Sequence, residues 1–193
     1  FDRVSTNEFI KNEIERSVVS EDEIADNASS ELRNIRRQKA RKEADIKAKL
    51  NSYITNSRYD DALQDKVVSI RDGRYVVPVK TNKKSIIGGI IHDKSSSGNT
   101  IFVEPSAIVE LNNQLKDLEL KEEDEIRRIL DRLSRFVQGF DIEILENQKI
   151  ISRIDFLAAK AKFAINNEYT KPNINTEKII SLKQARPPLL KGK

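Results

Sequence analysis

Apolar residues recur at helical spacing in the first part of the chain. Between residues 6 and 19 they predict a short amphipathic helix, whose apolar positions are Phe9, Ile10, Ile14 and Val18. A loop of small and polar residues over 26–30 separates it from a longer helix over 30–53. This second helix is mostly polar, and its sparse buried positions are predicted to be Leu32, Ile35, Ile46 and Leu50.

The clearest helical pattern covers residues 106–138. Its apolar stripe consists of two sets of four positions, Ile108, Leu111, Leu115 and Leu118 and then Ile126, Ile129, Leu133 and Phe136. The second set follows the first by about five turns at 3.6 residues per turn, so the stripe stays on one face of a straight helix about 50 Å long. Gly139 predicts a break. A last helix should reach about residue 167, with an apolar face formed by Ile150, Ile154, Leu157, Ala161 and Ala164, and end before Pro172.

Between residues 66 and 105 the apolar period changes to two, which predicts strands over 67–70, 74–80, 86–92 and 99–104. Asp72 and Gly73 are a hairpin-turn signal between the first two strands. Pro78 places the second strand at an edge of the sheet, because proline lacks the N–H of a ladder hydrogen bond. The order helix, sheet, helix predicts a mainly α fold. Long helices over 30–53 and 106–138 should pair antiparallel and hold a small antiparallel sheet at their tip.

Composition narrows the class of protein. Apolar residues make up 37% of the chain and charged residues 34%, which suits long helices with one buried stripe. The chain has no Cys, which excludes a disulfide framework and a thiolate zinc site. No signal-peptide pattern occurs and no apolar run approaches the roughly 20 residues of a membrane span, so we expect a soluble, cytoplasmic protein. The chain starts with Phe1 and contains no Met, so we expect either an internal piece of a longer protein or a sequence from which Met residues were dropped.

Three clusters are candidates for chemistry, and each has a simpler interpretation that we favour. His92 beside Asp93 has the composition of an acid–base pair, but no nucleophile or second His accompanies it, which favours a strand end next to a turn. The run over 92–100 offers donors for a phosphate but lacks the P-loop pattern, which favours a hairpin loop. The consecutive acids over 122–125 point around a helix, which favours a solvated face over a metal site. We therefore predict no catalytic residue, metal ligand or enzymatic activity in this segment.

Basic residues are the best candidates for a functional surface. Residues 30–50 contain eight basic and three acidic residues, and residues 66–103 contain seven and two. Bases between Arg36 and Lys42 occupy nearly every face of the long helix, so this helix either crosses solvent or lies against an anion. In the predicted sheet, the candidate nucleic-acid contacts are Arg71, Arg74, Lys80, Lys83, Lys84 and Lys94. Few aromatic residues lie near them, which favours phosphates of duplex DNA or structured RNA over a single-strand stacking platform. The alternative is a solubilising surface.

The region over 68–80, which reads VSIRDGRYVVPVK, resembles a known family. The likeness continues at His92-Asp93, Ser95, Ser97-Gly98, Thr100, Phe102, Glu104-Pro105, the run over 110–113, the run over 28–32, Asp155-Phe156 and the run over 159–161. The family is the second subfamily of bacterial MutS paralogues, which end in an Smr nuclease domain. The run over 185–190, ARPPLL, is similar to the ARHPLL that opens the ATPase domain of the family, but Pro187 replaces its His and puts a nucleotide contact there in doubt.

This resemblance implies a division of the chain. Residues 1–65 would form core and ascending lever helices, residues 66–105 a β clamp, residues 106–177 the descending lever and core helices, and residues 178–193 the start of an ATPase domain. The parent protein would be a homodimeric ATPase that uses ATP and Mg²⁺ and carries an Smr endonuclease domain. No cofactor is expected in this segment.

The resemblance leaves three functions for this segment. The first is a DNA-binding clamp and lever of a protein that binds branched or recombination-intermediate DNA and suppresses recombination. The second is a clamp that engages rRNA on collided ribosomes for ATP-driven splitting and rescue. The third is a structural arm that couples the ATPase to the tip without binding.

Overall fold

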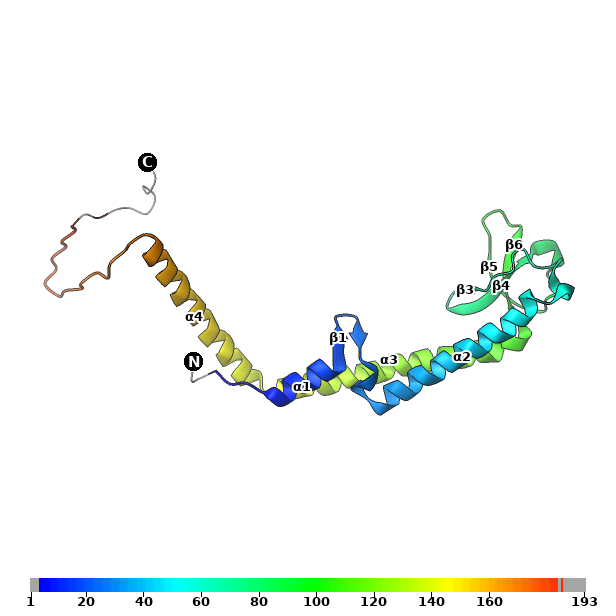
Figure 1. Cartoon of the computed structure of the whole chain (residues 1–193), viewed down its shortest axis with the longest axis horizontal. Coiled ribbons are helices and arrows are strands. Elements are labelled where there is room, and N and C mark those ends of the chain that lie inside the picture. Colours follow the sequence, from blue (N-terminus) through cyan, green and yellow to red (C-terminus); the bar gives the residue numbers. More distant parts are fainter. Residues whose placement is uncertain (1–3, 184, 186–193) are drawn as a thin grey trace. The chain divides into compact units, whose positions relative to one another are not determined.

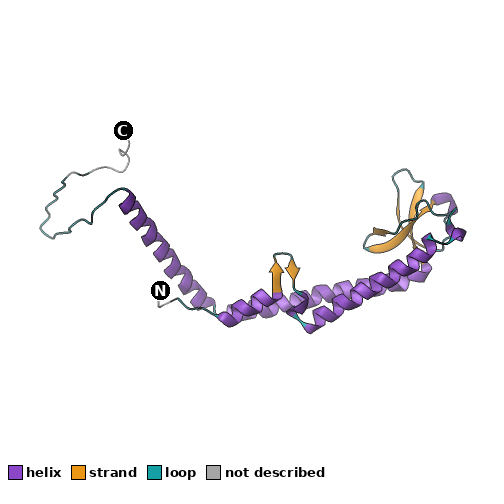
Figure 2. Ribbon diagram, viewed as in Figure 1, coloured by secondary structure: helices purple, strands orange, loops and turns teal. Residues whose placement is uncertain are grey.

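The computed structural model describes residues 4–183 and residue 185. Two compact units result, one over Glu8–Val137 and one formed by the described residues on either side of that range (Figure 1). The helices are α1 (Glu8–Ser17), α2 (Ser30–Ile54), α3 (Val109–Gln138) and α4 (Asp141–Asn166). The strands are β1 (Val18–Ser20), β2 (Glu23–Ile24), β3 (Ser69–Arg71), β4 (Arg74–Lys80), β5 (Gly89–Lys94) and β6 (Thr100–Pro105) (Figure 2). The mainly α fold with a small antiparallel sheet of four strands is as predicted.

Helices α2 and α3 run antiparallel, as their order in the sequence predicts. Leu32, near the start of α2, packs with Ile129 and Leu133 from the C-terminal half of α3. Leu50, near the end of α2, shares a cluster with Ile108, just before α3. The four positions predicted to be buried in α2 are its four buried residues. The sparse apolar stripe of α2 is therefore sufficient because α3 presents a complementary stripe along its length.

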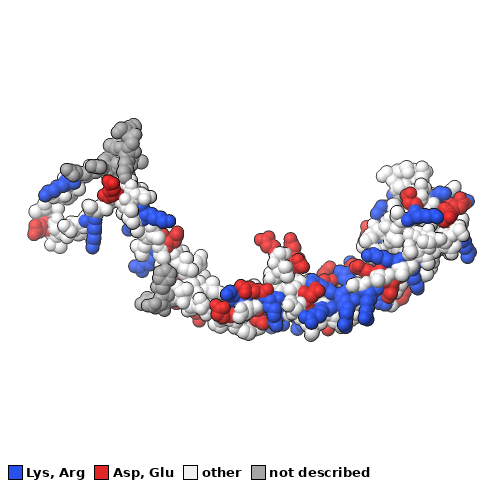
Figure 3. Space-filling view, in the orientation of Figure 1, with Lys and Arg blue, Asp and Glu red and all other residues white. Residues whose placement is uncertain are grey.

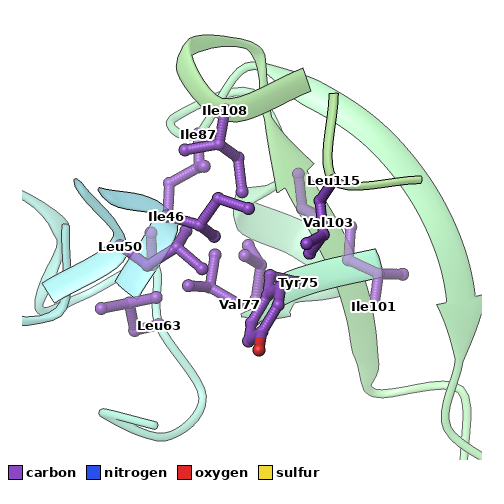
Figure 4. Packing of buried hydrophobic residues seen from close by; sticks show 12 residues of the cluster. Ile46, Leu50, Leu63, Tyr75, Val77, Ile87, Ile101, Val103, Ile108 and Leu115 are labelled. Carbon is purple, nitrogen blue, oxygen red and sulfur yellow. The ribbon is translucent and has the colours of Figure 1, made fainter. Parts of the chain in front are cut away.

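Strands β3 to β6 form one antiparallel sheet in the order β3-β4-β6-β5. This sheet, with the turns between its strands, is called the β module below, and it spans residues 69–105. Its core is continuous with the end of α2 and the start of α3 (Figure 4). The buried members of this cluster are Ile46, Leu50, Ala62, Leu63, Tyr75, Val77, Val79, Ile87, Ile101, Val103, Ile108 and Leu115. The sheet is thus packed directly onto the helix pair.

The prediction that Pro78 makes β4 an edge strand is wrong. β4 is an interior strand, with β3 on one side and β6 on the other. However, β3 pairs only with residues 74–76 of β4, so it does not reach Pro78. The carbonyl oxygen of Pro78 accepts a hydrogen bond of 3.0 Å from the Gln64 N–H. Because N–H and C=O of one strand residue point to the same side, the proline ring faces this irregular segment and removes no hydrogen bond to β6.

The structure departs from prediction at the end of the first helix. The predicted helix over 6–19 ends at Ser17, and the chain continues into β1 and β2, a small hairpin that the sequence did not indicate. The backbone N–H of Ala25 donates to the carbonyl oxygen of Ser17 at 2.9 Å, so the hairpin closes directly onto the end of α1. Ile24 of this hairpin packs with Leu32 of α2 and Ile129 of α3, which ties it to the helix pair.

Helix α4 begins two residues after the predicted break at Gly139. Its predicted apolar face is not covered: within the described part of the chain, α4 has no buried residue. The exposed apolar side chains are distributed around the helix rather than along one face, and include Ile142, Leu145, Ile151, Phe156, Phe163 and Ile165. None of the helices that the structure describes is both long and apolar enough to span a membrane.

The acidic run over 122–125 is not a uniformly solvated face, so that interpretation is wrong for two of its residues. Glu122 of α3 accepts hydrogen bonds from Arg36 Nε at 2.8 Å and Lys39 Nζ at 2.9 Å, both from α2. Burial opposes ionisation of Glu122, but the hydrogen bonds from Lys39 and Arg36 outweigh it and hold its pKa below the ordinary value. Two of the bases between residues 36 and 42 therefore belong to the contact between the helices.

Glu125 has a second structural role, at the start of α2. The Ser29 hydroxyl accepts a hydrogen bond from the Leu32 N–H at 2.9 Å, which caps α2, and it donates to Glu125 at 2.6 Å. Arg128 donates two hydrogen bonds to Glu125, and these, with the Ser29 hydroxyl, lower the pKa of Glu125 against the effect of its burial. Glu125 thus fixes the N-terminus of α2 against α3.

Acidification is expected to weaken the contact between α2 and α3. The folded-state pKa of Glu122 lies below its ordinary value of 4.5, so its stabilising contribution is complete above that value and is lost as the pH falls through the folded-state pKa. Glu122→Gln should reduce the free energy of unfolding by about 1–2 kcal/mol at neutral pH and flatten its decline in acid. Urea unfolding at a series of pH values from neutral to acid measures both effects.

The neighbouring Glu123 provides the matched control for this test, because its side chain is exposed on the same helix. Glu123→Gln should leave both the neutral-pH stability and its acid dependence close to those of the unmodified chain. Equal pH profiles for the unmodified chain and Glu122→Gln would contradict the prediction.

Candidate nucleic-acid interface

The β3–β4 hairpin carries two of the six predicted contact residues, Arg71 and Arg74, which are paired across the strands. Asp72 and Gly73 between them both have positive φ, 49° and 74°, as the predicted turn requires. The Arg71 guanidinium lies 3.8 Å from the centroid of the Phe102 ring and its Nε is 3.1 Å from an oxygen of Asp93. Arg71 is thus held on the sheet, with part of its side chain exposed.

Arg74 belongs to a buried polar network centred on Glu104, whose side chain is 0% exposed. Arg74 Nη1 donates to Glu104 Oε1 at 2.9 Å, and Asn112 Nδ2 donates to the same oxygen at 2.7 Å. His92 Nε2 lies 2.5 Å from Glu104 Oε2. Asn112 also bonds the N–H and the C=O of Tyr75, at 3.3 and 3.1 Å. The network therefore joins strands β4, β5 and β6 to the first turn of α3.

The favoured interpretation of His92 and Asp93 as a strand end next to a turn is wrong, because the predicted strand over 86–92 is β5 (Gly89–Lys94) and contains both residues. They do not form the alternative acid–base pair either, because each has another partner. His92 contacts Glu104 and Asp93 contacts Arg71. The physical reason is an irregularity in β5, where the pairing with β6 shifts between Ile91 and Asp93. Such bulges redirect the side chain of the extra residue.

The other four candidates lie at the opposite end of the sheet from the β3–β4 turn; we call Lys80, Lys83, Lys84 and Lys94 the lysine end. Lys80 is opposite Thr100 and Lys94 is opposite Ile101 on β6. The turn over Thr81–Lys83 is tied to the β5–β6 loop by a hydrogen bond of 2.7 Å from the Thr81 hydroxyl to the Gly98 carbonyl. The lysine end therefore has a fixed backbone.

Asp61 is the acidic neighbour of the lysine end. One of its oxygens lies 2.5 Å from Lys83 Nζ, and the other lies 4.0 Å from Lys80 Nζ. The hydrogen bond and charge of Lys83 lower the pKa of Asp61, although its side chain is 70% exposed. Lys84 and Lys94 are exposed and form no ion pair within the residues that the structure describes.

Three backbone N–H groups of the β5–β6 loop are bonded within the loop and its strand ends. The N–H of Ser95 donates to the Thr100 carbonyl, that of Gly98 to the Ser95 carbonyl, and that of Thr100 to the Ser95 hydroxyl, at 2.8 to 3.1 Å. Gly98 adopts a φ of 75°, which closes the turn. The loop is therefore a hairpin turn, as predicted, and these three N–H groups are not available to a phosphate. No group of three or more His, Asp or Glu among the described residues is arranged to hold a metal ion.

Comparison with known proteins identifies the relatives of this chain. No protein-family model matches it. It is 49% identical over 187 residues to Endonuclease MutS2 of Alkaliphilus oremlandii, which covers 97% of this chain and 24% of that protein. It is 46% identical to Endonuclease MutS2 of Clostridioides difficile, over 95% of this chain and 23% of that protein, and 46% identical to that of Halothermothrix orenii, over 100% and 24%.

The chain belongs to the MutS2 family. It spans about a quarter of the length of the MutS2 relatives it matches. The resemblance seen in the run over 68–80 is thereby confirmed at the level of the family. The run over 186–190, with Pro187 in place of the His of the family, lies outside the described residues, so its predicted place at the start of an ATPase domain stays a prediction.

Sequence reasoning missed the Glu104 network of this MutS2 segment. The resemblance includes Glu104-Pro105 and the run over 110–113, but no local pattern shows that Glu104, Asn112 and His92 meet. One signal was present: Glu104 interrupts an apolar strand directly after Val103. A carboxylate in a buried strand requires partners, and strong donors lie elsewhere in the predicted sheet.

Proposed function

We propose that this segment is the nucleic-acid-binding clamp and lever of a MutS2 protein, with the β module as the clamp and α2 and α3 as the lever. The observation that carries the proposal is the lysine end, where four bases gather on one fixed end of the sheet. Lysines on a fixed scaffold bind backbone phosphates without reading sequence. The whole protein is proposed to act as a cytoplasmic homodimer on branched or recombination-intermediate DNA and to suppress recombination. Its ATP, Mg²⁺ and nuclease chemistry would reside in parts outside this chain.

The two ends of the β module have different parts in this proposal. The lysine end makes the phosphate contacts, because its bases are exposed or held only by the exposed Asp61. Arg71 and Arg74 remain candidates. However, Arg74 already donates hydrogen bonds to Glu104 and to Asn113 Oδ1, at 2.9 and 2.8 Å. Arg74 therefore mainly holds the clamp in shape, and a charge change there would alter the fold as well as binding.

The lever function is supported by how firmly the helices are joined. Glu122 bonds Arg36 and Lys39 between α2 and α3, and Asn112 of α3 bonds Glu104 of the sheet. A displacement of the helix pair would therefore move the sheet with it. A purely structural arm would share this property, so binding at the lysine end separates the two functions.

Neutralising the lysine end is expected to weaken binding to branched DNA. The test variant combines Lys80→Gln, Lys83→Gln, Lys84→Gln and Lys94→Gln. Each lost phosphate contact should lower the slope of log K against log salt by at most about 0.9. Fluorescence anisotropy with a labelled four-way junction at several salt concentrations measures affinity and slope. Unchanged affinity and slope would favour the purely structural arm.

The same variant also decides between DNA and the ribosome. Phosphate is common to both targets, so the whole MutS2 protein should be offered branched DNA and collided ribosomes in competition. We expect the unmodified protein to bind the DNA junction in preference to collided ribosomes. The lysine variant should lose this preference. Preferential retention on collided ribosomes would instead assign the clamp to rRNA and ribosome rescue.

A further inference from the structure

The outward face of α2 carries a line of arginines that the proposed clamp does not use. Arg33, Arg37 and Arg41 are all exposed and follow one another at intervals of four residues. At 1.5 Å per residue, they are spread over about 12 Å of the helix, one above the next. Figure 3 shows Lys and Arg side chains gathered along this helix. We call these three residues the arginine stripe.

The structure divides the basic residues of α2 into two groups. Arg36 and Lys39 face α3 and bond Glu122, and Arg36 also pairs with Asp26. The arginine stripe has no such partner: within the described part of the chain, none of its residues forms an ion pair, and its one side-chain hydrogen bond is a long one of 3.3 Å from Arg37 to Asn34. The acidic residues that pair with the bases of α2 therefore lie on the side that faces α3. The outward face of α2 keeps its positive charge.

The side chains around the arginine stripe are mostly small, and few of them are acidic. Ala40, Ala44 and Ala48 are exposed beside or beyond it, so no large side chain shields the helix on this face. Glu31 and Glu43 lie two residues from Arg33 and Arg41, and therefore on other faces of the helix. On the face of the stripe itself the acidic residue is Asp45, four residues after Arg41, and no ion pair joins the two among the described residues. Like charges one turn apart destabilise a helix, so an uncompensated line of three disfavours the free state.

The face also continues towards the β module. Beyond the stripe, Lys47, Ala48 and Asn51 line an open pocket of about 620 Å³ together with Val68, Ile70 and Tyr75. Lys47 Nζ lies 5.8 Å from the centroid of the Tyr75 ring. A ligand lying along the arginine stripe would therefore meet another base, Lys47, at the junction with β3.

We propose that the arginine stripe binds the phosphodiester backbone of duplex nucleic acid, as a contact surface on the lever separate from the lysine end. Guanidinium groups suit this ligand, since their planar donors can hold two phosphate oxygens at once. The proposal shares its ligand class with the proposed function and adds a second surface. Duplex DNA and duplex RNA offer the same backbone, so the ligand is defined by its phosphates.

The test replaces the stripe with glutamine and compares it with a control of equal charge change. The stripe variant combines Arg33→Gln, Arg37→Gln and Arg41→Gln. The control removes three exposed bases of α3 that have acids within a turn, Lys116→Gln, Lys121→Gln and Arg127→Gln. Gln and Arg have similar helix propensities, and circular dichroism would establish that both variants keep their helices. The probes are a labelled DNA duplex and an RNA duplex of the same sequence.

The stripe variant is expected to bind about eightfold more weakly per lost contact at about 0.1 M salt, because log K falls by about 0.9 per decade of salt for each phosphate contact. The control variant should bind like the unmodified protein. Whichever duplex is weakened more identifies the source of the backbone. Binding by the stripe variant equal to that of the unmodified protein, equal weakening by the control, or no duplex binding at all would each overturn the proposal. Loss in the lysine variant alone would leave the proposed function standing without the stripe.

Discussion

Replacing Glu104 with leucine is expected to destabilise the protein by about 3–5 kcal/mol, because it removes one member of a buried charged network and leaves the others unpaired. Arg74, Asn112 and His92 all contact this carboxylate, and Glu104 is fully buried. Leucine fills a similar volume but accepts no hydrogen bond. The loss should be measured as the free energy of unfolding in urea.

Two comparisons make the Glu104 result specific. Glu123→Leu removes an exposed carboxylate of α3 and should change stability by no more than about 0.5 kcal/mol. Glu104→Gln keeps an acceptor for Arg74 but loses the charge, so its cost should fall between those of the two leucine variants. A Glu104→Leu protein as stable as the Glu123→Leu protein would show that the network contributes little to the fold.

Gly89→Ala is expected to destabilise the β module by about 3 kcal/mol, at the upper end of the range for overpacking a core. A Cβ on Gly89 would lie 2.0 Å from the backbone oxygen of Glu104 and 2.9 Å from Cα of Pro105. These are backbone atoms of the neighbouring strand β6, so neither can move without breaking the pairing of β5 with β6. Part of the loss should also appear as disorder of β5, which hydrogen exchange would detect.

The adjacent Gly88 is a natural control for that substitution. A Cβ on Gly88 would meet nothing within 4 Å, and its φ is not in the left-handed region. Gly88→Ala should therefore leave stability unchanged or raise it slightly, because alanine restricts the unfolded chain. If both alanine variants unfolded at the same urea concentration, the close approach of β5 to β6 at Gly89 would be refuted.

The regular elements could be predicted because their causes are local in the sequence. The stripe from Ile108 to Phe136 defines α3, and the start of α2 at Ser30 follows from the polar loop before it. Helix pairing also followed, since each apolar stripe requires a partner. The predicted edge position of β4 at Pro78 was wrong because strand order depends on which segment covers each side of a strand. Here an irregular segment near Gln64 covers the side of β4 at Pro78.

The candidate site was predictable in composition but not in arrangement. The sequence identifies all six bases, yet only the pairing of β4 and β5 with β6 shows that four of them share one end of the sheet. The structure also shows that Arg74 bonds Glu104 and Asn113, which no local sequence pattern indicates. Likewise, the bases between Arg36 and Lys42 look alike in the sequence but have two roles. Those that face α3 bond Glu122, and Arg37 and Arg41 stay exposed on the outward face of α2.

Asp61 has a consequence for how tightly the lysine end holds a polyanion. Its carboxylate already acts as a tethered counterion for Lys83 and lies near Lys80. When a phosphate takes its place, this counterion stays attached to the chain and gains no entropy of dilution, unlike a salt ion released into solution. The clamp would therefore release fewer ions than it makes phosphate contacts, and Asp61 would act as a built-in competitor that keeps the grip reversible.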